Sequence, residues 1–268
     1  MNITFGFIGT GNMGGALAQA VAKVARPELI WLSNRTPAKA EALAAKLGCR
    51  AVPAADAAAE CGYLFLGVKP QMMGELMAEI APILAERTDR FVLVTMAAGL
   101  PMAQIRQMAG GDYPVIRIMP NTPVSVGAGV ILYDTTADVT EQERKVFCEA
   151  LAEAGLLDRL PEALIDAGSA VSGCGPAFAD LFVEALADGG VACGLPRAKA
   201  QLYAAQMLLG SAKLILESGQ HPGQLKDAVC SPGGSTIAGV RALEQRAFRA
   251  ACMEAVEAAC KRTKELGK

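Results

Sequence analysis

The stretch that decides the fold of the N-terminal half is Ile3-Thr-Phe-Gly-Phe-Ile-Gly-Thr-Gly-Asn-Met-Gly14. Its first six residues, Ile3–Ile8, form a short apolar run of the kind that is typical of a buried parallel strand. Glycines follow at positions 9, 11 and 14, and a helical pattern then extends over Met13–Val24. A strand, a glycine-rich turn and a helix therefore follow one another directly at the start of the chain.

The three glycines have the order Gly-x-Gly-x-x-Gly, and each position has a physical reason. Gly9 permits the tight turn, Gly11 lets the backbone approach a pyrophosphate, and Gly14 lets the helix pack closely on the strand. The alternative, a glycine-rich turn without a ligand, is disfavoured because a second strand, Leu29–Leu32, follows as in a βαβ unit. We therefore predict a dinucleotide site that includes Ile8, Gly9, Thr10, Gly11, Asn12, Met13 and Gly14, with the helix N-terminus facing the phosphates.

The end of the second strand indicates which dinucleotide is preferred. NAD-specific sites carry an acidic residue there for the ribose 2′-hydroxyl, whereas this chain has Ser33-Asn34-Arg35-Thr36 and no acid. Arg35 offers a fork of donors to a 2′-phosphate, and Ser33 and Asn34 add neutral donors. NADP(H) is therefore the predicted cofactor. NADH remains open, as does the interpretation that Arg35 is only a solvated surface charge.

The rest of the first half alternates short apolar runs with amphipathic stretches. We expect further strands at Tyr63–Val68, Phe91–Thr95 and Val115–Met119, and edge strands at Val126–Asp134 and Leu156–Arg159. Helices are expected at Pro37–Leu47 and Pro70–Leu84. Pro82 weakens the last turn of the second of these helices. This alternation predicts an α/β Rossmann-type domain over residues 1–160, with a mostly parallel sheet and helices on both faces.

Residues 161–268 contain 22 Ala and no convincing strand, and they predict an all-α domain. Helices are expected near 162–171, 176–192, 196–217, 222–229 and 236–265. The whole chain is 52% hydrophobic but only 5% aromatic. Such a composition requires either a large hydrophobic core within one chain or an apolar face that a second copy of the chain covers. The alanine-rich half favours the second alternative, a core shared between two copies.

Bulk properties exclude several classes of protein. The formal net charge is −2 without a basic tract, which argues against nucleic-acid binding. No apolar run of about 18 residues is free of charge, Gly or Pro, and no signal peptide is evident, so we expect a cytoplasmic protein without a membrane span. The eight Cys form no Cys-x-x-Cys pair and are expected to be small buried hydrophobes. A single His, His221, makes a metal site improbable.

Further candidates follow later strands and interrupt the helical half. Val68, Lys69, Pro70, Ala97 and Asn121 lie at predicted strand ends, which face the ligand crevice in open parallel sheets, although each also fits an ordinary turn. In the helical half, Ser231-Pro-Gly-Gly-Ser-Thr236 places hydroxyls and free backbone N–H groups at a helix start. This arrangement suits a carboxylate, and the alternative is a capped turn between helices.

The chain resembles the pyrroline-5-carboxylate reductase family from end to end. The motifs that carry the resemblance are Phe7–Gly14, Val68–Pro70, Met119–Pro123, Ser172-Gly-Cys-Gly-Pro-Ala-Phe178 and, most specifically, Ser231–Gly239. Cys174, Phe178 and Cys230 depart from the residues that are commoner in the family. The resemblance implies reduction of L-1-pyrroline-5-carboxylate to L-proline with NAD(P)H, a helical dimerisation domain at residues 161–268 and, in some members, a ring of dimers.

The same resemblance assigns roles to residues of this chain. Ser231, Gly234, Ser235 and Thr236 would bind the substrate carboxylate, and Thr236 would also hydrogen-bond the ring nitrogen. Lys69, Pro70, Ala97 and Asn121 would line the nicotinamide end. Because a cyclic imine can be protonated before it binds, positioning suffices and no strong acid is needed. His221 precedes Pro222 at a helix start, so we interpret it as structural.

Two rival functions remain at this point. A β-hydroxyacid dehydrogenase would carry a lysine in a Gly-x-x-x-Lys helix motif, and the comparable stretch here, Gly168–Ser172, ends in Ser. A non-catalytic regulator that senses NADP would have the same fold but would catalyse no reaction. The complete Ser231–Thr236 segment, which suits a substrate carboxylate, argues against such a regulator. The sequence leaves open the use of NADH in the cell, the number of subunits beyond two and inhibition by proline.

Overall fold

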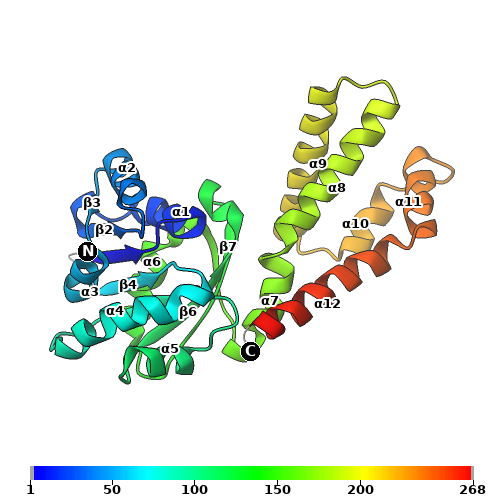
Figure 1. Cartoon of the computed structure of the whole chain (residues 1–268). Coiled ribbons are helices and arrows are strands. Elements are labelled where there is room, and N and C mark those ends of the chain that lie inside the picture. Colours follow the sequence, from blue (N-terminus) through cyan, green and yellow to red (C-terminus); the bar gives the residue numbers. More distant parts are fainter. Residues whose placement is uncertain (1–2, 267–268) are drawn as a thin grey trace. The chain divides into compact units, whose positions relative to one another are not determined.

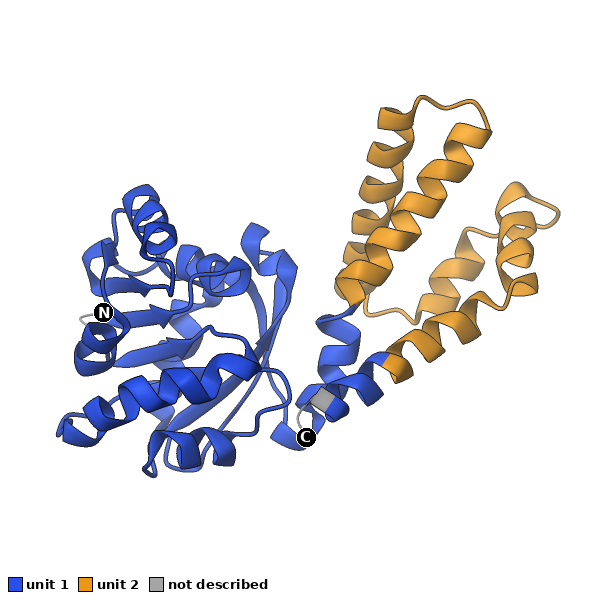
Figure 2. Ribbon diagram, viewed as in Figure 1, with its two compact units in different colours: residues 1–174, 259–268 blue, residues 175–258 orange. Residues whose placement is uncertain are grey.

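The structure is a computed structural model that describes residues 3–266, and it divides into two compact units. Unit 1 comprises Met1–Cys174 with Ala259–Lys268, and unit 2 comprises Gly175–Ala258 (Figure 2). The predicted domain boundary after residue 160 stays a prediction. The compact units divide later in the chain because the helix at Glu162–Ser172 packs on the sheet of unit 1.

Within residues 3–266, unit 1 contains an eight-stranded sheet in the order β3-β2-β1-β4-β5-β6-β7-β8 (Figure 1). Strands β1 to β6 run parallel, β7 is antiparallel to β6, and β8 is parallel to β7. The order 3-2-1-4-5-6 is that of dinucleotide-binding folds, which confirms the predicted fold class. The strands are β1 Phe5–Ile8, β2 Ile30–Ser33, β3 Arg50–Ala51, β4 Tyr63–Leu66, β5 Val92–Thr95, β6 Val115–Pro120, β7 Gly129–Thr135 and β8 Gly155–Arg159.

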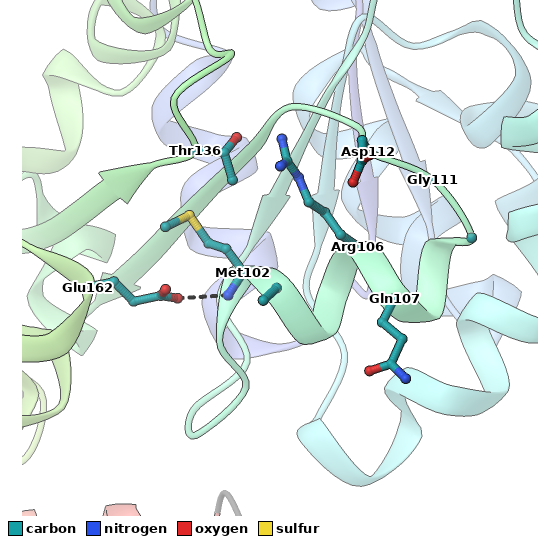
Figure 3. Close-up of a pocket in the computed structure, with 9 residues that line it drawn as sticks. Met102, Arg106, Gln107, Gly111, Asp112, Thr136 and Glu162 are labelled. Atoms are coloured by element: carbon teal, nitrogen blue, oxygen red, sulfur yellow. Dashed lines mark hydrogen bonds between the residues drawn. The ribbon is translucent and has the colours of Figure 1, made fainter.

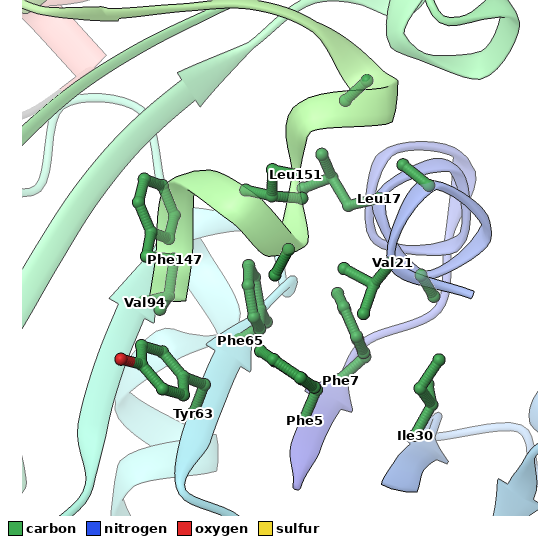
Figure 4. Packing of buried hydrophobic residues seen from close by; sticks show 14 of the residues in the cluster. Phe5, Phe7, Leu17, Val21, Ile30, Tyr63, Phe65, Val94, Phe147 and Leu151 are labelled. Atoms are coloured by element: carbon green, nitrogen blue, oxygen red, sulfur yellow. The ribbon is translucent and has the colours of Figure 1, made fainter. Parts of the chain in front are cut away.

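Helices cover both faces of this sheet, and each face has its own apolar cluster. On one face Phe7 stacks on Phe65 with ring centroids 4.4 Å apart, beside Leu17 and Phe147 (Figure 4). On the other face α3, α4 and α5 supply the buried side chains. The helices are α1 Asn12–Val21, α2 Pro37–Leu47, α3 Ala54–Glu60, α4 Met73–Glu86, α5 Met102–Ala109, α6 Glu141–Ala150 and α7 Glu162–Ser172, with short 3₁₀ turns η1 Pro27–Leu29, η2 Pro70–Met72, η3 Thr122–Val126 and η4 Ala152–Ala154.

Unit 2 is helical and has almost no core of its own. Its elements are α8 Gly175–Ala192, α9 Arg197–Ser218, α10 Pro222–Ala228, α11 Ser235–Gln245 and most of α12 Phe248–Leu266, whose end belongs to unit 1. The residues of unit 2 that are buried within the chain are three alanines, Ala187, Ala200 and Ala204. Large apolar side chains are exposed instead, and Leu216 is 82% exposed.

Several predicted elements need correction. The single helix predicted at 236–265 is wrong, because Ala247 adopts a φ of 55° and separates α11 from α12. The first helix ends at Val21 rather than Val24, whereas α4 continues through Pro82 to Glu86. The strand expected at Val126–Asp134 begins only at Gly129, since η3 occupies the preceding residues, and it is not an edge strand because β8 pairs with it. β3, α3, α5 and α6 were not predicted.

The cysteines and one apolar helical stretch also differ from expectation. Among the eight cysteines only Cys61 is buried, while Cys193 and Cys252 are exposed because unit 2 leaves its apolar surface uncovered within one chain. By length and composition alone, the helical stretch Glu162–Ala192 would be able to cross a membrane, with a mean hydropathy of 1.3 in its most apolar window. That is weak support for a span, since the core helices of other proteins have a similar composition.

Candidate functional site

The glycine turn after β1 is shaped by close backbone contact. Gly9 adopts a φ of +100°, which favours glycine, and a Cβ on Gly14 would lie 2.1 Å from the Gly9 carbonyl oxygen. Sequence reasoning missed Gly67, where a Cβ would lie 2.5 Å from that same oxygen. Its only signal was a glycine directly after β4. By contrast, a Cβ on Gly11 would meet nothing within 4 Å, so the space beside Gly11 is open to a ligand.

A cavity of about 780 Å³ opens at the carboxyl ends of β1, β2 and β4. The predicted cofactor residues that line it are Ile8, Gly9, Gly11, Ser33, Asn34, Arg35, Val68 and Lys69. The structure therefore brings together the glycine turn, the end of β2 and the end of β4, which are far apart in the sequence. The remaining predicted cofactor residues, Thr10, Asn12, Met13, Gly14, Pro70, Ala97 and Asn121, are not part of its wall.

The start of α1 offers unsatisfied donors beside this cavity. The first helical hydrogen bond runs from Gly15 N–H to Gly11 C=O, so the preceding N–H groups have no partner within the helix. No acidic residue lies in the first turn of α1, and no side chain caps the helix. The Thr10 hydroxyl is buried and has no hydrogen-bond partner. Unpaired donors at a helix N-terminus fit the pyrophosphate of a dinucleotide.

The end of β2 carries a positive charge that is not neutralised. Arg35 is exposed, and its Nη1 donates to the Met72 sulfur at 3.6 Å, while the Asn34 side chain donates to Thr36 C=O. Ser33 is buried, and its carbonyl accepts from Gly9 N–H at 2.8 Å, which ties the glycine turn to β2. The absence of an acid at this strand end, within residues 3–266, suits a 2′-phosphate better than a 2′-hydroxyl.

The residues predicted at the nicotinamide end lie at the ends of three successive strands. Lys69 caps η2 after β4, Ala97 follows β5 and is buried, and Asn121 follows β6 and is also buried. The Asn121 side chain donates to Ser172 C=O at 2.9 Å and accepts from Val130 N–H at 2.8 Å. Its carboxamide therefore joins the end of α7 to the start of β7.

The predicted carboxylate-binding segment lies in unit 2, in the turn before α11. Gly233 adopts a φ of +70°, and a Cβ on Gly234 would lie 2.4 Å from the Ser231 hydroxyl oxygen, so that hydroxyl folds over the turn. Gly234 is the N-cap of α11 and provides no side-chain cap. The first helical hydrogen bond comes from Ala238 N–H, which leaves the N–H groups of Ser235 and Thr236 without helical partners.

His221 is structural, as expected from its position before Pro222. It is the N-cap of α10, and its Nδ1 accepts from Gly223 N–H at 3.0 Å. The Gln224 side chain accepts in return from the His221 N–H, which completes a capping box. No group of three metal-ligating side chains occurs within the part of the chain that the structure describes.

A second cavity, of about 600 Å³, lies beside α5 and contains no residue singled out from the sequence (Figure 3). The Glu162 carboxylate on its wall accepts from Met102 N–H at 2.7 Å and so caps α5. Arg106 is held by Asp138 and by Tyr113 C=O. Glu162 and Arg106 are therefore both engaged within the protein, and the hydrogen bond from Met102 N–H to Glu162 ties α5 to α7.

Comparison with known proteins identifies similar sequences over the whole chain. Residues 162–266 match the family model for pyrroline-5-carboxylate reductase dimerisation, and residues 4–99 match the model described as NADP oxidoreductase, coenzyme F420-dependent. The chain is 42% identical to pyrroline-5-carboxylate reductase of Synechocystis sp. and 38% identical to that of Escherichia coli, each over 271 residues and 100% of both chains.

A solved structure agrees with these sequence matches. The crystal structure of Plasmodium falciparum pyrroline carboxylate reductase with NADP bound superposes with a TM-score of 0.89 at 32% identity. The superposition covers 100% of this chain and 99% of that one. Both units of the chain therefore have their counterparts in that protein.

Proposed function

The chain belongs to the pyrroline-5-carboxylate reductase family, and on that premise we propose that it reduces L-1-pyrroline-5-carboxylate to L-proline with NADPH or NADH. This reaction is the last step of proline biosynthesis. The observation that carries the proposal is the full-length similarity to named reductases, which extends over both the cofactor cavity and the Ser231–Gly239 segment. We further propose a cytoplasmic location.

The residues that we propose to bind the cofactor lie in unit 1. When bound, NADPH supplies the hydride that adds to the carbon of the cyclic C=N bond. The N-terminus of α1 would bind the pyrophosphate, and Ser33, Asn34 and Arg35 would bind the 2′-phosphate. Lys69 would line the nicotinamide end. The residues assigned to the cofactor are Ile8, Gly9, Thr10, Gly11, Asn12, Met13, Gly14, Ser33, Asn34, Arg35, Val68, Lys69, Pro70, Ala97 and Asn121.

The residues that we propose to bind the substrate lie in unit 2. The free N–H groups of Ser235 and Thr236 and the Ser231 hydroxyl would hold the substrate carboxylate, and Gly234 keeps the turn open for that hydroxyl. We assign Thr236 as the catalytic residue, since its hydroxyl would orient the ring nitrogen by a hydrogen bond. Fixing the imine in this way supplies the positioning that hydride addition requires.

The substitution Thr236→Ala tests this assignment. Removing one hydrogen bond that orients the reacting ring should lower turnover by about tenfold or more, because a misplaced imine reacts slowly. Binding of NADPH, followed by quenching of Trp31 fluorescence, should remain nearly unchanged. Unchanged turnover would remove Thr236 from the mechanism, and a parallel loss of NADPH binding would point to a folding defect.

One assay separates the proposed function from its rivals. Oxidation of NADPH in the presence of pyrroline-5-carboxylate supports the reductase, whereas oxidation of a hydroxyacid with NADP would support a β-hydroxyacid dehydrogenase. Tight binding of NADPH without turnover of either substrate would instead indicate a regulator that has kept only the fold.

We also propose that the chain is a homodimer that forms through residues 161–268, with residues 1–160 as the dinucleotide-binding domain. Support comes from unit 2, in which only three alanines are buried while side chains such as Leu181 and Leu209 are exposed. A second copy is a better cover than a membrane for the stretch Glu162–Ala192, since that stretch carries Glu162, Asp166, Asp180, Glu184 and Asp188. We also propose that these dimers assemble into a higher oligomer.

A further inference from the structure

Lys39 lines the cofactor cavity, but it belongs to none of the sequence motifs that predicted the cofactor site. It is in the first turn of α2, the helix that follows β2, and its side chain is exposed. It lines the same cavity as Ser33, Asn34 and Arg35. The cavity wall therefore has two cations close to the end of β2, one on the loop and one on the helix.

Neither cation is neutralised by the protein. Within residues 3–266, no carboxylate forms an ion pair with Arg35 or Lys39, although Arg87, Arg90 and Arg117 of the same unit are each paired. Two unpaired cations at one end of a cavity favour an anionic group there.

The start of α2 adds to this preference for an anion. Thr36 is the N-cap, yet its hydroxyl makes no capping bond, and no acidic residue lies in the first turn. Glu41 also lines the cavity, but residues two apart on a helix do not face each other, and no ion pair joins Glu41 to Lys39 in the described part of the chain. Glu75 and Glu79 line the cavity from a different helix, α4.

We propose that Lys39 is a specificity-determining residue, and that its ammonium group binds the 2′-phosphate of NADP(H) together with Arg35 and the Thr36 hydroxyl. This inference rests on the proposed use of NADP(H). NADH has a hydroxyl at the same position and gains nothing from a second cation. Lys39 therefore raises the preference for NADPH over NADH without touching the reacting atoms.

The test compares Lys39→Met with Lys46→Met, because both lysines lie on α2 and both substitutions remove one charge. Lys46 is exposed, interacts with the Gln19 side chain and does not line the cavity. Loss of a charged hydrogen bond should raise KM for NADPH by about tenfold or more in Lys39→Met, with KM for NADH within about twofold of the original. Lys46→Met should change neither value, and Lys39→Arg should retain most of the preference.

Calorimetric titration with adenosine 2′,5′-bisphosphate and adenosine 5′-monophosphate makes the test independent of imine reduction. In Lys39→Met, affinity for the bisphosphate should fall toward that for the monophosphate, even if the chain proves not to reduce pyrroline-5-carboxylate. An equal loss for both nucleotides, no loss for either, or the same loss in Lys46→Met would overturn the assignment.

Discussion

At the scale of single residues, Asn121 shows how a group at the carboxyl end of the sheet also supports the fold. Its carboxamide donates to Ser172 C=O, the last residue of α7, and accepts from Val130 N–H in β7. Both partners are backbone groups, and the side chain is buried. A buried backbone group that loses its partner keeps the full cost of its desolvation, so this one side chain satisfies two such groups.

The substitution Asn121→Ala should therefore lower the free energy of unfolding by about 2–4 kcal/mol, since two buried hydrogen bonds disappear together. Chemical denaturation followed by circular dichroism measures the change. Thr122→Ala is the matched control, because the neighbouring Thr122 side chain is exposed and should change stability little. Equal midpoints for the two variants would show that Asn121 does not hold α7 in place.

At the scale of elements, α6 depends on a charged capping box. Glu143 accepts at its carboxylate from Thr140 N–H at 2.7 Å and from Arg90 Nε at 2.7 Å, and Thr140 Oγ1 accepts in return from Glu143 N–H. Burial raises the pKa of Glu143, but the hydrogen bonds from Arg90 and Thr140 outweigh it, so the pKa lies below its ordinary value. Ionised Glu143 consequently stabilises the folded state.

The effect of Glu143→Gln on the free energy of unfolding should depend on pH, because the pKa of Glu143 differs between the folded and unfolded states. A lowered pKa in the folded state means that the stabilisation is present above the unfolded pKa of Glu and is lost as pH falls through the folded value. At neutral pH the variant should be about 1–2 kcal/mol less stable, and the difference should shrink in acid. Urea unfolding across this range measures it, with the exposed pair of Glu149 and Lys145, probed by Glu149→Gln, as the control. A difference that is independent of pH would contradict the role of the charge.

Elements that local sequence determines were predictable, and elements that depend on tertiary contact were not. Pro37–Leu47 was predicted with both ends correct, because Pro37 starts the helix and Gly48 ends it in a left-handed conformation. β3 has only two residues, Arg50 and Ala51, both exposed, and so carries no pattern. The sequence also gives no signal for the break between α11 and α12 at Ala247, because alanine is an excellent helix former.

The same distinction holds for the candidate site. The glycine turn at residues 9–14 could be recognised because its spacing is local, and so could the segment at Ser231–Thr236. Gly67 directly follows β4 and approaches Gly9 only in the folded chain, and only the structure shows that the Lys39 side chain of α2 lines the same cavity. The spacing of residues along the sequence does not indicate which distant segments come into contact in the folded chain.

For the molecule as a whole, the composition is compatible with a hydrophobic core within one chain or with a core formed between two copies. Unit 1 buries large side chains on both faces of its sheet, whereas the buried residues of unit 2 are three alanines. Apolar surface that is buried only on association stabilises the associated state alone. The helical half should therefore gain most of its stability from a second copy.

The stability of the chain should therefore depend on protein concentration. For a dimer that unfolds to monomers, Tm rises with concentration, and a hundredfold dilution is equivalent to about 2.7 kcal/mol of association free energy. Thermal unfolding at several concentrations should show this rise, and light scattering should give at least twice the chain mass of 27.8 kDa. NADPH added in excess should raise Tm at every concentration, because it binds only folded chains. An active monomer whose Tm is the same at all concentrations would mean that the exposed apolar side chains of unit 2 need no partner.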